Sequence, residues 1–494
     1  MLIRKVCTLL LTGAGWFGMV GGMQAQGLDS LQVSLATTVT AATQAYQPLW
    51  LVSNQYGALA DRQLDLSSHL RITNAHFLGG YDGARSKVNT QTGLIGGGPP
   101  QQGFAVRYGL DLYNNAAFRH TFLQEAYVKL SFRRWEVRGG LFRETIGEVD
   151  PVLSSGSLNI SGNALPVPQV GLAVVEYTEV PYTGGLLQFK GGLSHGWLGT
   201  NRWYKHAFLH EKYGFLRLNR PTYAVYGGLH HYALWGGMAA DAEPQEATAG
   251  YSTLHNYGVA VFPRPQSGVD HRAIIEFGGD YKADFGTFHL YHQTPYEVSQ
   301  GMKLLTPDQL TGVSFTPNQA DAVLKRVVVE FIYTRHMANR VYYNDHKYRT
   351  GWEYEDRVLG NPLLTNRMRA SHYFPAFVPF DWSGAGGVVP GNANIVNPKV
   401  AGIHTGAQYR LGTLFTAQTR LTLVQNYGQN ERSPFYQTTQ CYTVQEVTYQ
   451  HEPLGLAVSG AIGCDLGQLT RNVGVRLTVK KQLFPSSLFF SNGR

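Results

Sequence analysis

The chain has 494 residues, with 41 Lys and Arg against 33 Asp and Glu and a net charge of +8. The excess is small and no basic cluster stands out, which argues against a nucleic-acid-binding surface. Only 15% of residues are charged, 12% are aromatic and 57 are glycines. After the first 25 residues no segment approaches the ~18 consecutive apolar residues of a spanning helix. This composition is typical of a secreted β-protein or of outer-membrane barrel strands.

The N-terminal segment has the pattern of a cleaved export signal. Arg4 and Lys5 form a short basic region, Val6–Val20 an apolar one, and a cleavage site follows at Ala25. We therefore expect residues 26–494 to form the exported protein.

Two segments near the start, Leu31–Thr40 and Leu64–Ile72, alternate loosely between apolar and polar residues and predict the first strands. Gly79–Gln102 is rich in Gly, Pro and Asn, which predicts a loop. The clearest hairpin joins Ala126–Phe132 to Trp135–Leu141, because pairing the residues that flank the two-residue turn keeps every apolar side chain on one face. The other face is polar and charged, which suits a barrel wall.

More strands follow in antiparallel order, since no neighbours are separated by a crossover helix. They are expected at Leu187–Leu193, Tyr223–Trp235, Ile275–Tyr281, Phe288–His292, Val327–Tyr333, Gln408–Phe415, Leu421–Tyr427, Cys441–Gln450 and Leu454–Cys464. Thr306-Pro307-Asp308 has the pattern of a helix start, so short helices are expected within Ser299–Lys325. At ~25 residues per strand and connection, the chain would form ~18 strands.

The last strand, Asn472–Phe484, alternates most sharply. One face would carry Val473, Val475, Leu477 and Val479, and the other Gly474, Arg476, Thr478 and Lys480. This pattern predicts an all-β fold, a transmembrane antiparallel β-barrel with apolar residues toward lipid, short helical elements and long extracellular loops. The strand also resembles the closing-strand signal of bacterial outer-membrane barrels, although Pro485–Arg494 follow it.

The two cysteines that survive cleavage flank a predicted turn. If the last strand runs inward, the turn His451–Leu454 is periplasmic. The midpoint of Cys441 and Cys464 falls at the centre of this turn, so a regular hairpin would place them opposite each other. We expect a disulfide between them, as an oxidising compartment permits.

Counting strands back from the inward-running last strand places His336–Val400 outside the cell. This segment holds many aromatic residues, and long segments of this kind often carry function. Sugar rings stack on Tyr and Trp, while hydroxyls and carboxylates accept hydrogen bonds from Tyr and Arg. The candidate polysaccharide-binding residues are therefore Tyr342, Tyr343, Tyr348, Arg349, Trp352 and Tyr354. An aromatic girdle or a packing cluster is the competing interpretation.

Motifs for catalysis or metal binding are weak. Gly192–Gly196 matches the nucleophile elbow G-x-S-x-G around Ser194, but no helical pattern follows it. The His210-Glu211 pair begins a zinc motif that has Gly214 at the second ligand position. Glu353, Glu355 and Asp356 could supply paired carboxylates, but solvated loop charges explain them as well.

Four stretches resemble the Wzi capsule-assembly family: Tyr46–Leu70, Ser154–Trp197, Tyr342–Leu364 and Asn392–Gly406, most densely around SGNALPVP. The resemblance implies an outer-membrane barrel of about eighteen strands with helical elements at its periplasmic side. It also implies a lectin-like role, holding exported capsular polysaccharide at the surface of a Gram-negative cell, and no hydrolytic role for Ser194.

We therefore predict a monomeric, non-enzymatic outer-membrane barrel, without cofactor or metal, whose extracellular loops bind capsular or surface polysaccharide. Its other expected partners are outer-membrane lipid and, during insertion, the barrel-assembly machinery; no nucleic acid is expected. Two alternatives remain. A porin or solute channel would have an unobstructed lumen, and a barrel hydrolase would need Ser194 activated by a histidine.

Overall fold

The computed structural model describes residues 31–78, 103–240, 268–296, 306–336, 344–383 and 393–484. The predicted export signal, the predicted loop Gly79–Gln102, Tyr342, Tyr343 and the tail Pro485–Arg494 lie outside these ranges.

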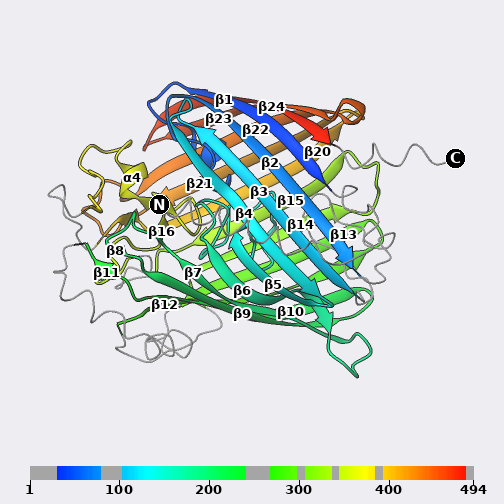
Figure 1. Ribbon diagram of the computed structural model, residues 1–494. Coiled ribbons are helices and arrows are strands. Elements are labelled where there is room, and N and C mark those ends of the chain that lie inside the picture. Colours follow the sequence, from blue (N-terminus) through cyan, green and yellow to red (C-terminus); the bar gives the residue numbers. More distant parts are fainter. Residues whose placement is uncertain are drawn as a thin grey trace, which may run out of the picture.

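Eighteen antiparallel strands form one closed barrel (Figure 1). The last strand, β24, pairs with β1, which also pairs with β2 and so closes the ring. The predicted fold class and strand number are confirmed. The strands are β1 Gln32–Ala42, β2 Leu64–Leu78, β3 Phe104–Asn115, β4 His120–Phe132, β5 Trp135–Leu141, β6 Gln169–Glu179, β7 Leu187–Trp197, β9 Phe208–Asn219, β10 Tyr223–Trp235, β12 Asp270–Ala283, β13 Gly286–Tyr296, β14 Gln309–Pro317, β15 Leu324–Tyr333, β20 Val400–Leu411, β21 Phe415–Asn426, β22 Thr438–His451, β23 Leu456–Gly467 and β24 Arg471–Phe484.

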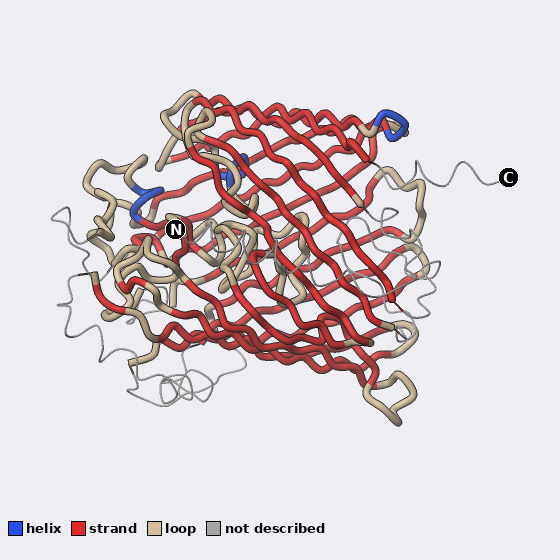
Figure 2. Tube along the Cα trace, viewed as in Figure 1, coloured by secondary structure: helices blue, strands red, loops and turns tan. Residues whose placement is uncertain are grey.

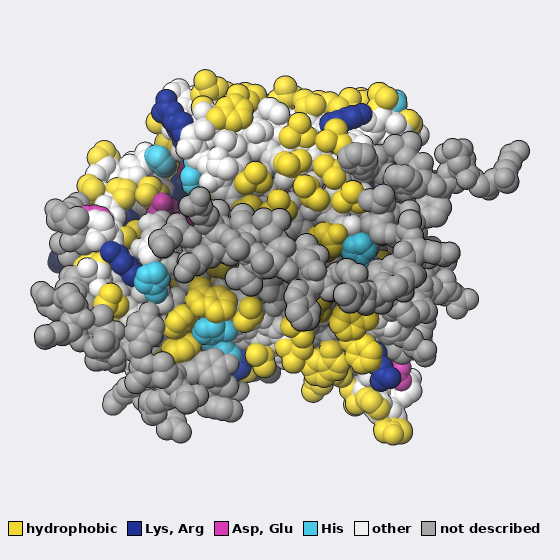
Figure 3. All heavy atoms as spheres, in the orientation of Figure 1, with side chains coloured by type: hydrophobic (Ala, Val, Ile, Leu, Met, Phe, Trp, Pro, Cys, Tyr) yellow, Lys and Arg dark blue, Asp and Glu magenta, His cyan; other side chains and the backbone are white. Residues whose placement is uncertain are grey.

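The alternation predicted for the last strand is present. The outward side chains of Val473, Val475, Leu477 and Val479 are 37%, 50%, 52% and 42% exposed. The opposite face points into the barrel, where Arg476 donates to the backbone oxygen of Leu51. Hydrophobic side chains likewise cover much of the outer wall in Figure 3. Such a wall is suited to lipid contact.

The predicted hairpin between β4 and β5 is confirmed. Phe132 lies opposite Trp135, with only two residues in the turn. The first of these, Arg133, has a φ of +55°, the conformation that tight hairpin turns require. Outward Val128, Phe132, Trp135 and Val137 are all more than 40% exposed, as expected of a lipid-facing surface.

The two ends of the barrel differ in their connections. At one end short turns join β4 to β5, β12 to β13, β20 to β21 and β22 to β23. At the other end long segments follow β1, β5, β10 and β15. Outer-membrane barrels have short periplasmic turns and long extracellular loops, so the long segments lie outside the cell. Figure 2 shows several of them folding back inside the ring of strands.

The helix predicted at Thr306-Pro307-Asp308 is wrong. These residues lead into β14, and β15 begins at Leu324. The helix-start pattern is local, whereas β14 gains backbone hydrogen bonds from both β13 and β15, so tertiary pairing decides the conformation. The predicted strand Gln408–Phe415 is also wrong, because a turn with Gly412 at φ +72° divides it.

Helices are few and short in the described residues. They are α2 Leu49–Val52, α4 Arg367–Ala370 and the 3₁₀ turn η3 Glu452–Leu454. Both α-helices lie in the long segments, at the end opposite the periplasmic side that the family resemblance implied. None of the helices in the described ranges is long and apolar enough to cross a membrane.

The predicted disulfide is not formed, because the register differs from the one expected. Cys441 lies opposite Leu466, Cys464 lies opposite Thr443, and both thiols are free. The turn has the predicted length but lies one residue later, since η3 and Gly455, with φ +56°, make His451 and Leu456 the first pair. The cysteines therefore sit diagonally, two positions out of register.

Candidate functional site

Three extracellular segments fill the upper part of the barrel. We call residues 43–63, 142–168 and 344–383 with 393–399 the plug. Its side chains form one hydrophobic core with the inner wall of the barrel. Trp50, Leu51, Leu158, Trp352 and Leu364, drawn from all three segments, are each no more than 1% exposed.

The first plug segment is fixed by the last strands. The backbone nitrogen of Leu49 donates to both carboxylate oxygens of Asp465 at 3.1 and 3.0 Å. Leu49 is the first residue of α2, and beneath α2 Gly463 of β23 lies opposite Gly474 of β24. A Cβ atom at Gly474 would lie 2.6 Å from Pro48, so glycine is required for the helix to approach the wall. The glycine of the closing-strand pattern thus has a packing role.

The second segment is held by polar side chains of the inner wall. Glu330 of β15 accepts hydrogen bonds from the hydroxyl of Ser154 at 2.5 Å and the backbone nitrogen of Ser155 at 2.7 Å. Gln293 of β13 accepts from the hydroxyl of Ser157 and the backbone nitrogen of Leu158, both at 3.1 Å. Small residues at this place let the loop backbone approach the wall, and the buried polar groups satisfy one another.

The third segment contains the predicted aromatic binding residues. The indole nitrogen of Trp352 donates to the backbone oxygen of Asn159, and its ring lies 5.5 Å from the ring of Tyr232. Tyr348 donates to the backbone oxygen of Gly236 at 3.3 Å. Trp352 and Tyr348 are 0% and 1% exposed, so neither offers a face to a sugar. The structure corrects their predicted role: both are packing residues of the plug, because burying their large rings fills the lumen.

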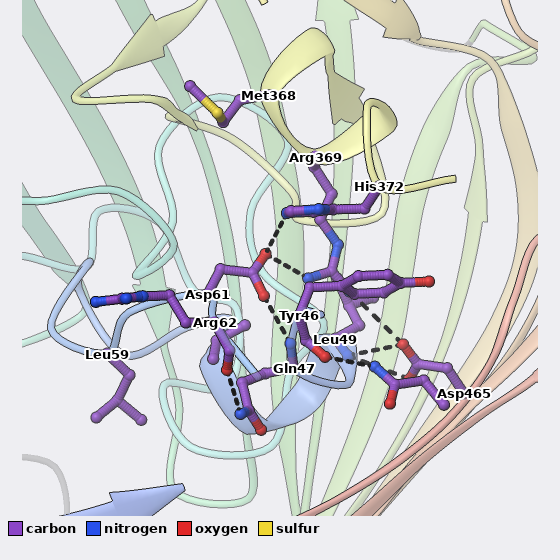
Figure 4. A network of polar contacts seen from close by, with 12 residues as sticks. Tyr46, Gln47, Leu49, Leu59, Asp61, Arg62, Met368, Arg369, His372 and Asp465 are labelled. Atoms are coloured by element: carbon purple, nitrogen blue, oxygen red, sulfur yellow. Dashed lines mark hydrogen bonds and ion pairs between the residues drawn. The ribbon is translucent and has the colours of Figure 1, made fainter. Parts of the chain in front are cut away.

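A polar network ties this segment to the first one and to the barrel wall (Figure 4). Arg369 lies at its centre, with its guanidinium 2.5 Å from Asp61 and 3.6 Å from Asp465. It also lies 5.0 Å from the ring of Tyr46, which stacks on His372 at 4.6 Å. Burial alone would raise the pKa of Asp61, but the nearby arginine charges hold that pKa below its usual range. The network orders the extracellular end.

The remaining predicted residues lie at the outer surface beside a second loop. Arg349 and Tyr354 are half-buried, and β8 Tyr204–Lys205 lies at the same end of the barrel as β16 Glu353–Tyr354 (Figure 1). The ammonium group of Lys347 lies 5.3 Å from the ring of Tyr204. Asn201 donates to a carboxylate oxygen of Glu355 at 3.1 Å. We define the mouth face as Asn201, Tyr204, Lys347, Arg349 and Tyr354.

Sequence reasoning did not find the part of the mouth face that comes from the loop after β7. The signal was present, since Asn201–His206 (NRWYKH) mixes aromatic, amide and basic residues as the predicted segment does. The short loop lies more than 140 residues before Lys347 in the chain, and only the fold brings the two together. The guanidinium of Arg349 lies 5.4 Å from the ring of Trp203, which links the two loops further.

Buried charges lie under the mouth face. Burial raises the pKa of Glu353 to about 7, although the amides of Asn366 and Asn394 donate to its carboxylate at 2.5 and 2.6 Å. Burial lowers the pKa of Arg202 to about 10. Glu353 is thus enclosed by its own partners and is not paired with a second carboxylate as a glycosidase would require.

Two small cavities lie beside the plug in the described part of the interior. They measure about 50 Å³ each, and Tyr56, Glu144 and Ile160 line both. Ligand pockets usually measure several hundred cubic ångströms. These two cavities are therefore too small to hold a sugar chain.

The serine of the nucleophile-elbow match lies in the wall, inside strand β7. Ser194 points inward and its hydroxyl donates to Glu211 at 3.2 Å, while His195 points outward against Trp197. A strand turning sharply into a helix is absent here, because β7 continues to Trp197. The described residues also contain no group of three or more His, Cys, Asp or Glu side chains arranged to hold a metal ion.

A family model described as Capsule assembly protein Wzi matches residues 80–370, more than half of the chain. The chain belongs to the Wzi capsule assembly family. The resemblance noted in the sequence is thereby confirmed. Wzi proteins are a capsule assembly family and not a family of enzymes, which agrees with the prediction of a non-catalytic protein. Membership and the apolar outer wall together make the chain an outer-membrane protein.

Among solved structures, Escherichia coli Wzi is similar, with a TM-score of 0.57 and 12% identity over 90% of this chain and 83% of that one. That protein is described as an outer membrane protein involved in group 1 capsule assembly and a carbohydrate-binding β-barrel. The similarity shows the shared fold.

Pseudomonas aeruginosa OpdL has a TM-score of 0.45 and 10% identity over 92% of this chain and 99% of its own. No curated protein sequence matches the chain.

Proposed function

We propose that the chain binds capsular polysaccharide on the mouth face and so retains exported polymer at the cell surface. The observation that carries this proposal is the combination of a filled lumen with an aromatic and cationic surface at the extracellular end. Membership of a capsule assembly family and the carbohydrate binding described for the E. coli protein support it.

The chemistry of the mouth face suits an acidic or hydroxyl-rich polymer. The ring of Tyr204 can stack on the apolar C–H face of a sugar, while Lys347 and Arg349 donate to hydroxyls or carboxylates. Each contact is weak. A repeating polymer can engage many copies of the protein at once, so attachment comes from avidity and needs no deep pocket.

A first experiment compares cell-attached with shed capsular polysaccharide in a strain that lacks the chain. Retention predicts an unchanged total amount of polymer that moves into the medium. Tyr204→Ala and Arg349→Ala should each weaken binding of purified polysaccharide about 2- to 10-fold, as loss of one stacking or polar contact implies. Unchanged attachment in the deletion strain would overturn the proposal.

Matched control variants are available at the same end of the barrel. Tyr436 is half-buried and donates to Glu431, and Arg335 lies 4.4 Å from the ring of Tyr427, both outside the mouth face. Tyr436→Ala and Arg335→Ala should leave polysaccharide binding unchanged. Equal losses in both pairs of variants would mean that the substitutions act on loop stability and not on binding.

The porin alternative requires an open lumen. The plug opposes it, because hydrophobic side chains of all three segments pack against the inner wall. Single-channel recording of the purified barrel tests this directly, and a large steady conductance would favour a channel. The protein is proposed to act as a monomer in contact with outer-membrane lipid after insertion by the barrel-assembly machinery.

A further inference from the structure

The inner wall of the barrel is basic toward its periplasmic end, over β24, β1, β2, β3 and β4, which lie side by side (Figure 1). Lys480 shares the inward face of β24 with Arg476. The register of the other strands points three more cations to the same side of the wall. We call this set the basic inner wall, and it consists of Lys480, Arg71, Arg107 and Lys129.

The strand between Lys480 and Arg71 carries short side chains on its inner face. Lys480 of β24 lies opposite Ala36 of β1, and Arg71 of β2 lies opposite Ser34 of β1. Alanine and serine leave room above the strand, so the long side chains on either side can extend over β1 toward each other. The two cations can therefore act on one ligand.

The carboxylates near this wall already have partners. Arg71 lies 3.1 Å from Glu125, and Arg107 lies 3.7 Å from Glu136. Beside them, Arg143 pairs with Asp111 at 3.2 Å and Arg138 pairs with Glu144 at 2.5 Å. Lys480 and Lys129 form no ion pair with any carboxylate of the described ranges. Their two charges are an excess that no acidic residue of this wall compensates.

The lumen beneath the plug is open to water. Lys480 is exposed, and the side chains of Arg71 and Arg107 are 36% and 29% exposed. Thr145 and Pro151 of the second plug segment are exposed too, although they lie inside the ring of strands. A barrel of 16–18 strands is wide enough for an aqueous channel where no segment fills it. The lumen is thus closed at its extracellular end and solvated at its periplasmic end.

A basic lumen that is closed above favours one class of ligand. Positive side chains inside a low-dielectric wall attract anions more strongly than the same charges on a flat surface. A long acidic polymer that entered from the periplasm would have to turn back beneath the plug. A protein loop or terminus that carries several carboxylates can instead end there.

We propose that the basic inner wall binds a carboxylate-rich peptide segment of a periplasmic partner protein, which enters the barrel from below. Lys480 supplies the exposed charge, and Lys129, which lies half-buried 4.7 Å from the ring of Phe142, adds a second. Arg71 and Arg107 have further N–H donors to share with the segment. The mouth face lies at the opposite end of the barrel, so this binding does not depend on polysaccharide.

The test titrates a fluorescent peptide of eight glutamates into the purified full-length barrel in neutral detergent and follows its anisotropy. An octaglutamine peptide with the same dye is the uncharged control. Lys480→Gln should weaken binding of the acidic peptide about 2- to 5-fold, as expected for one exposed ion pair, and Lys480→Arg should restore it. A further loss is expected on adding Lys129→Gln.

Lys481→Gln is the matched control. Lys481 is the next residue of the same strand and is also exposed, but it lies opposite Leu35, which is on the outer wall and 46% exposed. Its substitution should leave peptide binding unchanged. An equal loss in Lys481→Gln and Lys480→Gln would mean that the peptide is attracted to the rim in general, and the proposal would fall.

Three other results would also overturn the proposal. They are equal binding of octaglutamine, unchanged binding by the double variant, and stronger binding of polygalacturonate than of the acidic peptide at equal carboxylate concentration, which would assign the wall to a polysaccharide. Because a variant can fail to fold, a second measurement uses the unaltered protein. A carbodiimide should cross-link the acidic peptide to Lys480 and not to Lys481 or Lys347, and mass spectrometry locates the bond. Absence of the Lys480 cross-link would refute the site.

Discussion

The buried carboxyl group of Glu353 makes the stability of the third plug segment depend on pH. It is 3% exposed and accepts hydrogen bonds from the amides of Asn366 and Asn394. Replacing it by Gln preserves the size and the acceptor oxygen but removes ionisation. Glu353→Gln therefore imitates the protonated form that burial favours.

The magnitude follows from the pKa of Glu353, which burial raises from an ordinary 4.5 to about 7. Because the folded segment holds the proton more tightly, its stability is fully present below pH 4.5 and is lost as the pH rises through 7. The free energy of opening should fall by about 1.4 kcal/mol per pH unit in this window, and by about 3 kcal/mol in total.

Hydrogen exchange measured by mass spectrometry tests this expectation on residues 351–366 between pH 5 and pH 8, after correction for intrinsic exchange rates. The unaltered segment should become less protected as the pH rises. The Glu353→Gln variant should lose most of this pH dependence and be better protected at pH 8. Glu355→Gln, at the exposed tip of the same hairpin, is the control and should retain most of the pH dependence.

The reasoning would be refuted by a pH-independent opening energy in the unaltered protein. It would equally fail if the Glu353→Gln variant retained the same slope, because another group would then bind the proton. Protection of the barrel strands serves as an internal reference, since their backbone hydrogen bonds should not change in either protein.

Three further predictions concern packing, the polar network and the thiols. Trp352→Ala removes a fully buried ring and should lower the stability of the plug by about 3–5 kcal/mol, measured by hydrogen exchange, while the barrel still migrates as a folded species in unheated gels. Arg369→Met leaves the buried carboxyl group of Asp465 without its ion pair and Asp61 with only His372 at 3.8 Å, so it should destabilise the same end by about 3–5 kcal/mol and limited proteolysis should cut there faster; unchanged cleavage would contradict the network's role. Cys441 and Cys464 should titrate as two thiols in the unfolded, unreduced protein, and a mobility shift on reduction would show that the register is wrong.

The sequence determined the features that depend on alternation along single strands. The period-two pattern of Asn472–Phe484 assigned one face to lipid and one to the lumen, and the short turn at Arg133 defined the register of its hairpin. In a barrel each strand must place its apolar side chains outward, so this information is local and the strand number follows from length. The four stretches that resemble the Wzi family indicated the family and the expected role in capsule assembly.

Only the tertiary structure decided what depends on contacts between distant segments. Tyr348 and Trp352 are residue types that often bind sugars. In the folded protein their large rings fill the lumen, and this burial keeps them away from the surface. The helix-start pattern at Thr306 yielded to pairing with two neighbouring strands. The mouth face joins Tyr204 to Lys347, because the packing of separate segments against one another sets these neighbours and no single stretch of sequence records it.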